Sequence, residues 1–111
     1  MNYAVKLTAD EKTQMCVNMA QHLPAIRRIL GVTQEEFGDL CGFSRIRVSH
    51  IENGREIMSW SQLTSVMFVC FVNADAKEYV LSNRLVPLRF MQFMQVKSEG
   101  ESPDWGGYSR M

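Results

Sequence analysis

Apolar residues recur at helical spacing along most of the chain, and capping signals divide this pattern into segments. A capping box places Ser, Thr or Asp before a helix and Glu or Gln three residues later, which satisfies two backbone N–H groups that the helix leaves unpaired. Such pairs occur at Thr8/Glu11, Thr33/Glu36, Ser59/Gln62 and Asp75/Glu78, and Ser44 is a further N-cap residue. We therefore predict an all-α fold, a compact bundle of about five to six helices that begin near residues 9, 34, 45, 60 and 76.

The first helical region extends from about residue 9 to residue 30 and contains Pro24. Proline lacks a backbone N–H and disfavours helical geometry in the residue before it. We therefore expect a kink or a break near Leu23, with Pro24 at the start of the second piece. Apolar residues should line one face of this piece and a glycine should end it, at Leu23, Ile26, Ile29, Leu30 and Gly31.

Three further segments have the pattern of helices, over residues 34–41, 45–53 and 60–72. The segment 60–72 is almost wholly apolar, which predicts the central buried helix of the fold. The inward-facing positions are expected at Phe37, Leu40 and Cys41 in the first segment and at Val48 and Ile51 in the second.

The segment from Leu85 to Val96 is rich in Leu, Val, Phe and Met and has Pro87 near a possible helix start. Its apolar residues are spread too widely for a single helical face. We favour a helix, and a strand over residues 88–96 is the alternative. From Lys97 onward the composition is polar and glycine-rich, which is typical of a flexible tail.

The two segments around residue 42 have the spacing that a helix-turn-helix requires. The two helices cross closely, so one inward position must be small, and Gly38 occupies it. The turn needs a residue that tolerates a left-handed backbone, and Gly42 occupies that position. Val48 and Ile51 supply a β-branched ridge on the second helix. The pattern therefore predicts a helix-turn-helix between Gln34 and Asn53.

Residues 32–55, VTQEEFGDLCGFSRIRVSHIENGR, resemble the lambda-repressor-like (XRE-type) helix-turn-helix family. The matching features are the Thr-Gln-Glu-Glu opening, the central glycine, the Ser-Arg start of the second helix and the Ile-Glu-Asn-Gly close. The departures are Phe37, where Leu is usual, and Gly38, where Ala is usual. The resemblance covers roughly residues 19–73 and implies a lambda-repressor-like fold that binds double-stranded DNA.

This division gives the chain four parts. We expect an N-terminal helical extension over residues 1–18 and the helix-turn-helix domain over residues 19–73. A C-terminal helical segment for dimerisation should follow over residues 74–97, and a flexible tail over residues 98–111.

The resemblance also implies roles for individual residues. Because the N-terminal part of the second helix enters the major groove in this family, the residues placed at base edges are Arg45, Ile46, Ser49 and His50. The residues placed at phosphates are Gln34, Arg47, Asn53 and Arg55. An ion pair between Arg27 and Glu52 is expected to fix the second helix against the first helical region.

The charge distribution predicts weak sequence-independent binding by a monomer. The formal net charge of the chain is zero. Residues 27–55 contain five arginines and four acidic residues, which gives a local net charge of +1. One recognition helix also reads few base pairs, which favours a homodimer. Exposed apolar residues near the C-terminus would form its interface, and the candidates are Leu88, Met91, Phe93 and Met94.

The function expected from these features is that of a sequence-specific transcriptional regulator, acting as a repressor. The alternatives are the antitoxin of a toxin–antitoxin pair, with a toxin-like protein partner, and a helix-turn-helix used as a protein-interaction module. Two histidines and three cysteines without ligand spacing favour no enzyme, no cofactor and no metal site. The absence of a signal peptide or a membrane segment from the sequence pattern predicts a cytoplasmic protein.

Overall fold

The structure, a computed structural model, describes residues 6–95 and contains six helices and no strand within them. The helices are α1 (Ala9–Leu30), α2 (Gln34–Cys41), α3 (Arg45–Glu52), α4 (Trp60–Phe71), α5 (Ala74–Ser82) and α6 (Leu88–Met94). The all-α fold is therefore confirmed, and the segment around residue 90 is a helix rather than the alternative strand. The tail predicted at 98–111 lies outside the described residues.

Most helices begin where the sequence predicts. Capping boxes at Thr8/Glu11, Thr33/Glu36 and Ser59/Gln62 start α1, α2 and α4. The prediction that Asp75 and Glu78 form a capping box at the start of the fifth helix is wrong. Instead, the side chain of Asn73 accepts a hydrogen bond from the Ala76 N–H at 2.9 Å, so α5 begins two residues earlier than expected.

The expected break at Leu23 is also wrong, since α1 continues through Pro24 as one helix. It crosses the predicted domain boundary at residue 18 without interruption. A proline inside a helix costs about 3 kcal/mol. The side chains of Met19, Leu23 and Ile26 on either side are fully buried, and each such side chain contributes roughly 1.5–3 kcal/mol through burial. Tertiary packing therefore outweighs the local preference against helix.

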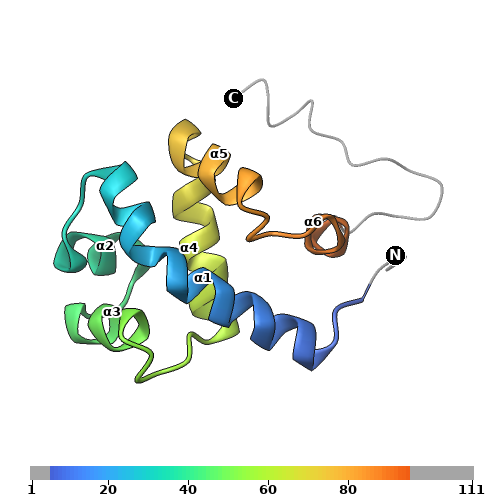
Figure 1. Ribbon diagram of the computed structural model, residues 1–111, viewed down its shortest axis with the longest axis horizontal. Coiled ribbons are helices and arrows are strands. Elements are labelled where there is room, and N and C mark those ends of the chain that lie inside the picture. Colours follow the sequence, from blue (N-terminus) through green and yellow to red (C-terminus); the bar gives the residue numbers. More distant parts are fainter. Residues whose placement is uncertain (1–5, 96–111) are drawn as a thin grey trace.

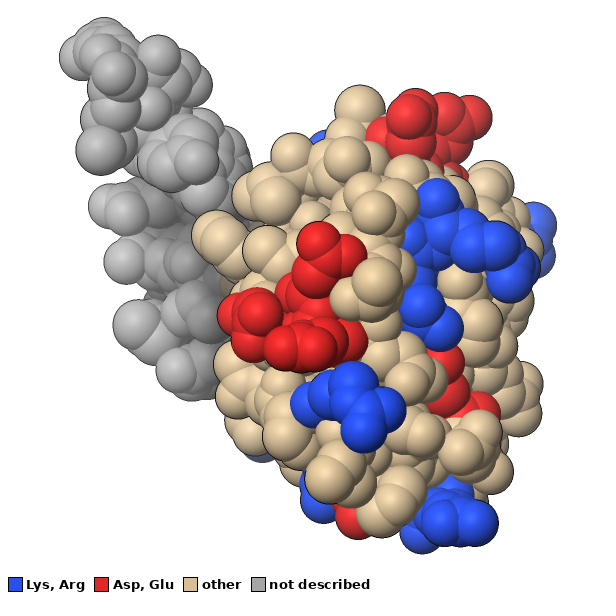
Figure 2. Space-filling view, turned by 90° about the vertical axis from the view of Figure 1, so that its left-hand side faces the viewer, with Lys and Arg blue, Asp and Glu red and all other residues tan. Residues whose placement is uncertain are grey.

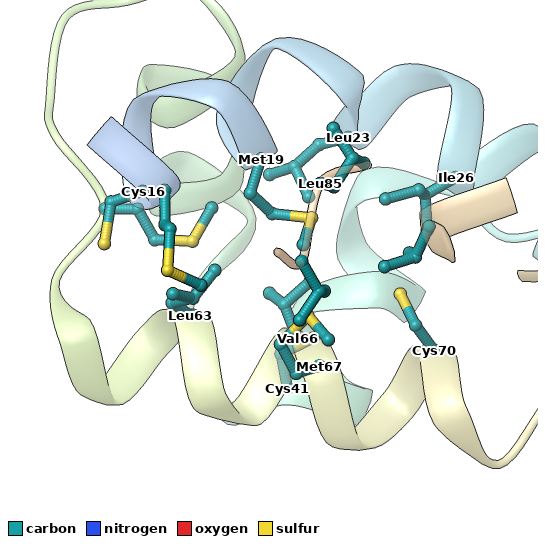
Figure 3. Close-up of a cluster of buried hydrophobic side chains, with 14 of the residues drawn as sticks. Cys16, Met19, Leu23, Ile26, Cys41, Leu63, Val66, Met67, Cys70 and Leu85 are labelled. Atoms are coloured by element: carbon teal, nitrogen blue, oxygen red, sulfur yellow. The ribbon is translucent and has the colours of Figure 1, made fainter. Parts of the chain in front are cut away.

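α1 crosses the front of α4 and packs against α3, α4 and α5 (Figure 1). Figure 3 shows the centre of the core, where side chains of α1 face those of α4. The facing residues are Cys16, Met19, Leu23 and Ile26 on α1, and Leu63, Val66, Met67 and Cys70 on α4, all of them buried. α2 and α3 pack against one another at the end of the molecule that lies opposite α6 (Figure 1).

Four apolar positions depart from their expected burial, Ile29, Leu40, Phe68 and Val72. Leu40 is 56% exposed, because Phe37, Gly38 and Cys41 define the buried side of α2 and Leu40 lies outside that arc. Ile29 is exposed near the end of α1. Within α4, Phe68 is 72% exposed, so this helix is central but has one side open.

The C-terminal helix α6 is attached by a few contacts. The ring of Phe90 is buried and meets Trp60 edge to face, with 5.8 Å between ring centroids. Arg89 bonds the Glu11 carboxylate at 2.9 Å and the Lys6 carbonyl at 2.8 Å. These contacts join α6 to the start of α4, through Trp60, and to the start of α1, through Glu11, at the opposite end from α2 and α3. None of the helices within residues 6–95 is long and apolar enough to cross a membrane.

Candidate nucleic-acid interface

The turn between α2 and α3 has the close geometry that the two glycines predict. A Cβ atom at Gly38 would collide with the backbone carbonyl oxygen of Phe43. Gly42 has a φ of +88°, a left-handed conformation that L side chains rarely adopt. The side chain of Ser44 then caps α3 by accepting a hydrogen bond from the Arg47 N–H at 3.1 Å. The sequence therefore builds a tight crossing of two eight-residue helices.

An ion pair between Arg27 of α1 and Glu52 of α3 fixes α3 against α1. Arg27 Nε lies 2.7 Å from Glu52 Oε2, and Arg27 Nη2 lies 3.0 Å from Glu52 Oε1. This two-pronged geometry is the strong form of an arginine–carboxylate contact. The Glu52 side chain is only 6% exposed. Hydrogen bonding to Glu52 raises the pKa of Arg27 further above its already high ordinary value, so the guanidinium stays charged.

Gln34, the first residue of α2, joins the same carboxylate. Its Nε2 atom donates to Glu52 Oε1 at 3.1 Å. Glu52 therefore ties α1, α2 and α3 together at one point. The rotation of α3 about its own axis is set by this contact and by the fully buried Val48 and Ile51.

The side of α3 opposite these contacts is open to solvent. Arg45 and Ile46 lie in the first turn of the helix, and both are exposed, Ile46 by 59%. Ser49 is half-buried, and its hydroxyl accepts from the Asn53 side chain at 3.4 Å. Neither Arg45 nor Arg55 forms an ion pair with any residue between 6 and 95.

Arg47 and His50, by contrast, are both bound to a carboxylate. Arg47 Nη1 forms an ion pair with Glu56 Oε2, and His50 Nδ1 lies 3.0 Å from Glu56 Oε1. Arg47 Nη2 also donates to the Gln62 side chain of α4 at 3.3 Å. Arg47, a phosphate candidate from the sequence, is therefore not free in the absence of DNA.

Sequence reasoning missed Glu56. It lies four residues beyond the end of α3, past the turn at Gly54, so no helical spacing connects it to Arg47 or His50. The hydrogen bond from His50 is the main cause that lowers the pKa of the Glu56 carboxyl, and the charge of Arg47 lowers it further.

The charges on this end of the molecule are mixed. Figure 2 views it directly and shows acidic and basic side chains side by side, without a continuous basic surface. The first turn of α2 is acidic, with Glu35 and Glu36 exposed, and Asp39 follows on the same helix. This mixture agrees with the small local charge of the sequence.

The dimer candidates lie on α6, far from this face (Figure 1). Leu88 is 73% exposed and Met94 is also exposed, whereas Met91 and Phe93 are half-buried. Met91 and Met94 line an apolar groove between α6 and α4, together with Thr64, Met67, Phe68, Phe71 and Phe90.

The three cysteines of the chain are free and buried. Burial raises the pKa of the Cys41 thiol to about 12 and that of Cys70 to about 11, so neither is a thiolate at neutral pH. Within residues 6–95, no three His, Cys, Asp or Glu side chains are grouped so that they could hold a metal ion.

Comparison with known families gives one result. Residues 18–76, slightly more than half of the chain, match a family model described as a helix-turn-helix domain. The match includes α2 and α3 completely, along with α4 and most of α1. Domains of this type are found in DNA-binding regulators and are typically not enzymes. No curated protein and no solved structure gives a match to the chain.

Proposed function

The chain belongs to the lambda-repressor-like helix-turn-helix family, and we propose that it is a sequence-specific transcriptional repressor that reads the DNA major groove with α3. The observation that carries this proposal is the open first turn of α3, where Arg45 and Ile46 face solvent on a helix that is braced from behind.

The chemistry of these two side chains fits base edges. An arginine can donate two hydrogen bonds to O6 and N7 of guanine, and an apolar side chain can contact the methyl group of thymine. An isoleucine that is 59% exposed contributes little to the stability of the monomer. Contact with a thymine methyl group would explain why Ile46 is exposed. Ser49 and His50, one turn further along α3, would complete the base-reading surface.

Phosphate contacts would come from the ends of the helices. Gln34 opens α2, where unpaired backbone N–H groups favour an anion. Asn53 and Arg55 are exposed directly after α3. Arg47 could contact phosphate only after leaving Glu56.

A homodimer would give this small interface enough affinity. Phe68 is exposed and lines the groove together with Met91 and Met94, and Leu88 is exposed on α6, the helix that carries both methionines. The groove and these exposed side chains therefore offer both large apolar groups and a place to receive them. A two-fold dimer requires such a self-complementary surface. We propose that a second copy of the chain covers it, with Phe93 at its edge, and that the two α3 helices read half-sites about 34–36 Å apart.

The test uses the DNA upstream of the protein's own gene in fluorescence anisotropy across a salt series, beside a scrambled duplex. Arg45→Ala should weaken binding to the specific duplex by on the order of tenfold to a hundredfold. Lys77→Ala is the control, because it removes one positive charge from the exposed face of α5. It should change binding little.

Equal and weak binding to both duplexes, unchanged by Arg45→Ala, would contradict DNA readout by α3. The remaining explanations would then be the antitoxin and the protein-interaction module. Co-purification with a toxin-like protein, lost on Leu88→Lys, would favour the antitoxin.

A further inference from the structure

One carboxylate holds two side chains of the recognition helix. Glu56 contacts Arg47 through Oε2 and His50 through Oε1, the latter at 3.0 Å. Residues three apart on a helix lie on the same side, so Arg47 and His50 are neighbours that share one partner. All three side chains are about one-third exposed, at 36%, 32% and 33% for Arg47, His50 and Glu56.

The backbone keeps Glu56 in this place. The N–H groups of Arg55 and Glu56 both donate to the carbonyl of His50, at 2.9 and 3.3 Å. On the other side, Gln62 accepts from Arg47 and also forms the capping box that starts α4. The cluster therefore connects the end of α3 with the start of α4 and is part of the folded structure.

For Arg47 the consequence is electrostatic. Contacts between cations and phosphates supply most of the sequence-independent affinity for DNA, and each one adds about 0.9 to the slope of log K against log salt. A guanidinium held by Glu56 and Gln62 adds such a contact only if a phosphate displaces the carboxylate. Glu56 thus removes one cation from nonspecific binding.

For His50 the consequence is a fixed tautomer. In a neutral imidazole one nitrogen donates and the other accepts. In the neutral ring, Nδ1 carries the hydrogen and donates, because it faces the Glu56 carboxylate, which can only accept. Nε2 of this neutral form is then the acceptor and the one ring nitrogen left for DNA. In the major groove, an acceptor matches the N6 amino group of adenine or the N4 amino group of cytosine.

We propose that Glu56 is a positioning residue that raises the sequence specificity of α3. It holds Arg47 away from phosphates and fixes His50 so that Nε2 accepts a hydrogen bond from the amino group of adenine or cytosine. This proposal rests on the proposed function, since it requires that α3 enters the major groove.

The first experiment measures the salt dependence of binding to a duplex of random sequence, which requires no knowledge of the operator. The proteins are the wild type, Glu56→Gln, Arg47→Ala and the double variant. Glu56→Gln keeps the shape of the side chain and removes its charge. It should bind the random duplex more tightly, with a slope steeper by about 0.9 per monomer. Arg47→Ala and the double variant should both keep the wild-type slope.

The matched control is Glu78→Gln. Glu78 is exposed on α5, away from α2 and α3, and no arginine within residues 6–95 pairs with it. The variant loses the same charge without releasing an arginine, so its slope should stay near that of the wild type.

The second experiment selects duplexes from a randomised pool with the wild type and with Glu56→Gln. His50→Ala identifies the base pair that His50 reads. The wild type should prefer adenine or cytosine there, and Glu56→Gln should reduce this preference roughly threefold or more. A role in folding alone would change neither the salt slope nor the preference at one base pair.

Two outcomes separate this proposal from the proposed function. If the wild type binds selected DNA but Glu56→Gln changes neither slope nor preference, Glu56 has no such role and the proposed function stands. If the wild type binds no duplex at any salt concentration, both fail. Should Glu56→Gln not fold, Arg47→Ala still decides, because a slope lower than that of the wild type by about 0.9 would show that Arg47 contacts phosphate in spite of Glu56.

Discussion

Around α3, polar side chains form two clusters of hydrogen bonds and ion pairs, one at Glu52 and one at Glu56, whereas the outer sides of α4 and α6 carry large apolar side chains that face solvent. Glu52 joins α1, α2 and α3, and Glu56 joins α3 to Gln62 of α4. At the other end, Phe68 and Leu88 are each more than 70% exposed.

This difference separates two requirements on a small binding domain. Hydrogen bonds and ion pairs are directional, so they can fix the orientation of a helix that must match base edges. Apolar contact is not directional, and it grows with the area removed from water. The polar end therefore suits recognition of a defined pattern, and the apolar end suits association.

Loss of the half-buried pair of Arg27 and Glu52 at the polar end should have the largest effect. Arg27→Ala leaves the Glu52 carboxylate, only 6% exposed, without its main partner. Breaking a fully buried ion pair costs about 3–5 kcal/mol. Because the Arg27 side chain is still 20% exposed and Glu52 keeps the hydrogen bond from Gln34, we expect the free energy of unfolding, measured by urea denaturation, to fall by about 3 kcal/mol, the lower end of that range.

The control for this prediction is the neighbouring Arg28→Ala. Arg28 is exposed and forms no ion pair within the described part of the chain. Its replacement should change the free energy of unfolding by less than about 0.5 kcal/mol. Equal effects of the two variants would show that the contact with Glu52 does not stabilise the fold.

A smaller loss is expected from Gly38→Ala. Alanine has a better helix propensity than glycine by about 1 kcal/mol, so propensity alone predicts stabilisation. A Cβ atom at this position would collide with the carbonyl oxygen of Phe43, which is backbone and cannot rotate away. Overpacking of this kind costs about 1–3 kcal/mol. We expect a net decrease in the urea midpoint, and an increase would show that the helix crossing has room to open.

The difference between the two ends also explains what the sequence could predict. Caps and tight turns depend on residues a few positions apart, so Thr33, Ser44 and Gly42 were predicted correctly. The pairing of Arg27 with Glu52 spans 25 positions and came from the family resemblance. No local rule could have supplied it.

The failures have physical reasons as well. The continuity of α1 through Pro24 depends on packing around Leu23 and Ile26, which overrides the local preference. The role of Glu56 depends on a turn that brings it back to α3. The exposure of Phe68 depends on which helices cover α4, and sequence periodicity alone does not contain that information.

The apolar end should respond to a single charge. Leu88→Lys places an ammonium group on the proposed dimer surface and should weaken self-association at least tenfold, because burying a leucine contributes roughly 1.5–3 kcal/mol. Sedimentation at tens of micromolar measures the effect. Ile57→Lys is the matched control, since Ile57 is also exposed but lies in the loop between α3 and α4. A wild type that sediments as a monomer at this concentration would exclude the dimer.

The smallest effect concerns the pH dependence of Glu56 at the polar end. Contact with His50 and Arg47 lowers the pKa of this carboxyl below its ordinary value of 4.5. A carboxyl whose pKa is lower in the folded state stabilises the fold above its unfolded pKa, and that stabilisation disappears as the pH falls through the folded pKa. The wild type should therefore be slightly more stable than Glu56→Gln near neutral pH, and their urea midpoints should converge as the pH is lowered below 4.5. A gap that stays constant over this range would mean that the Glu56 charge does not stabilise the end of α3, although its shape could still order the loop.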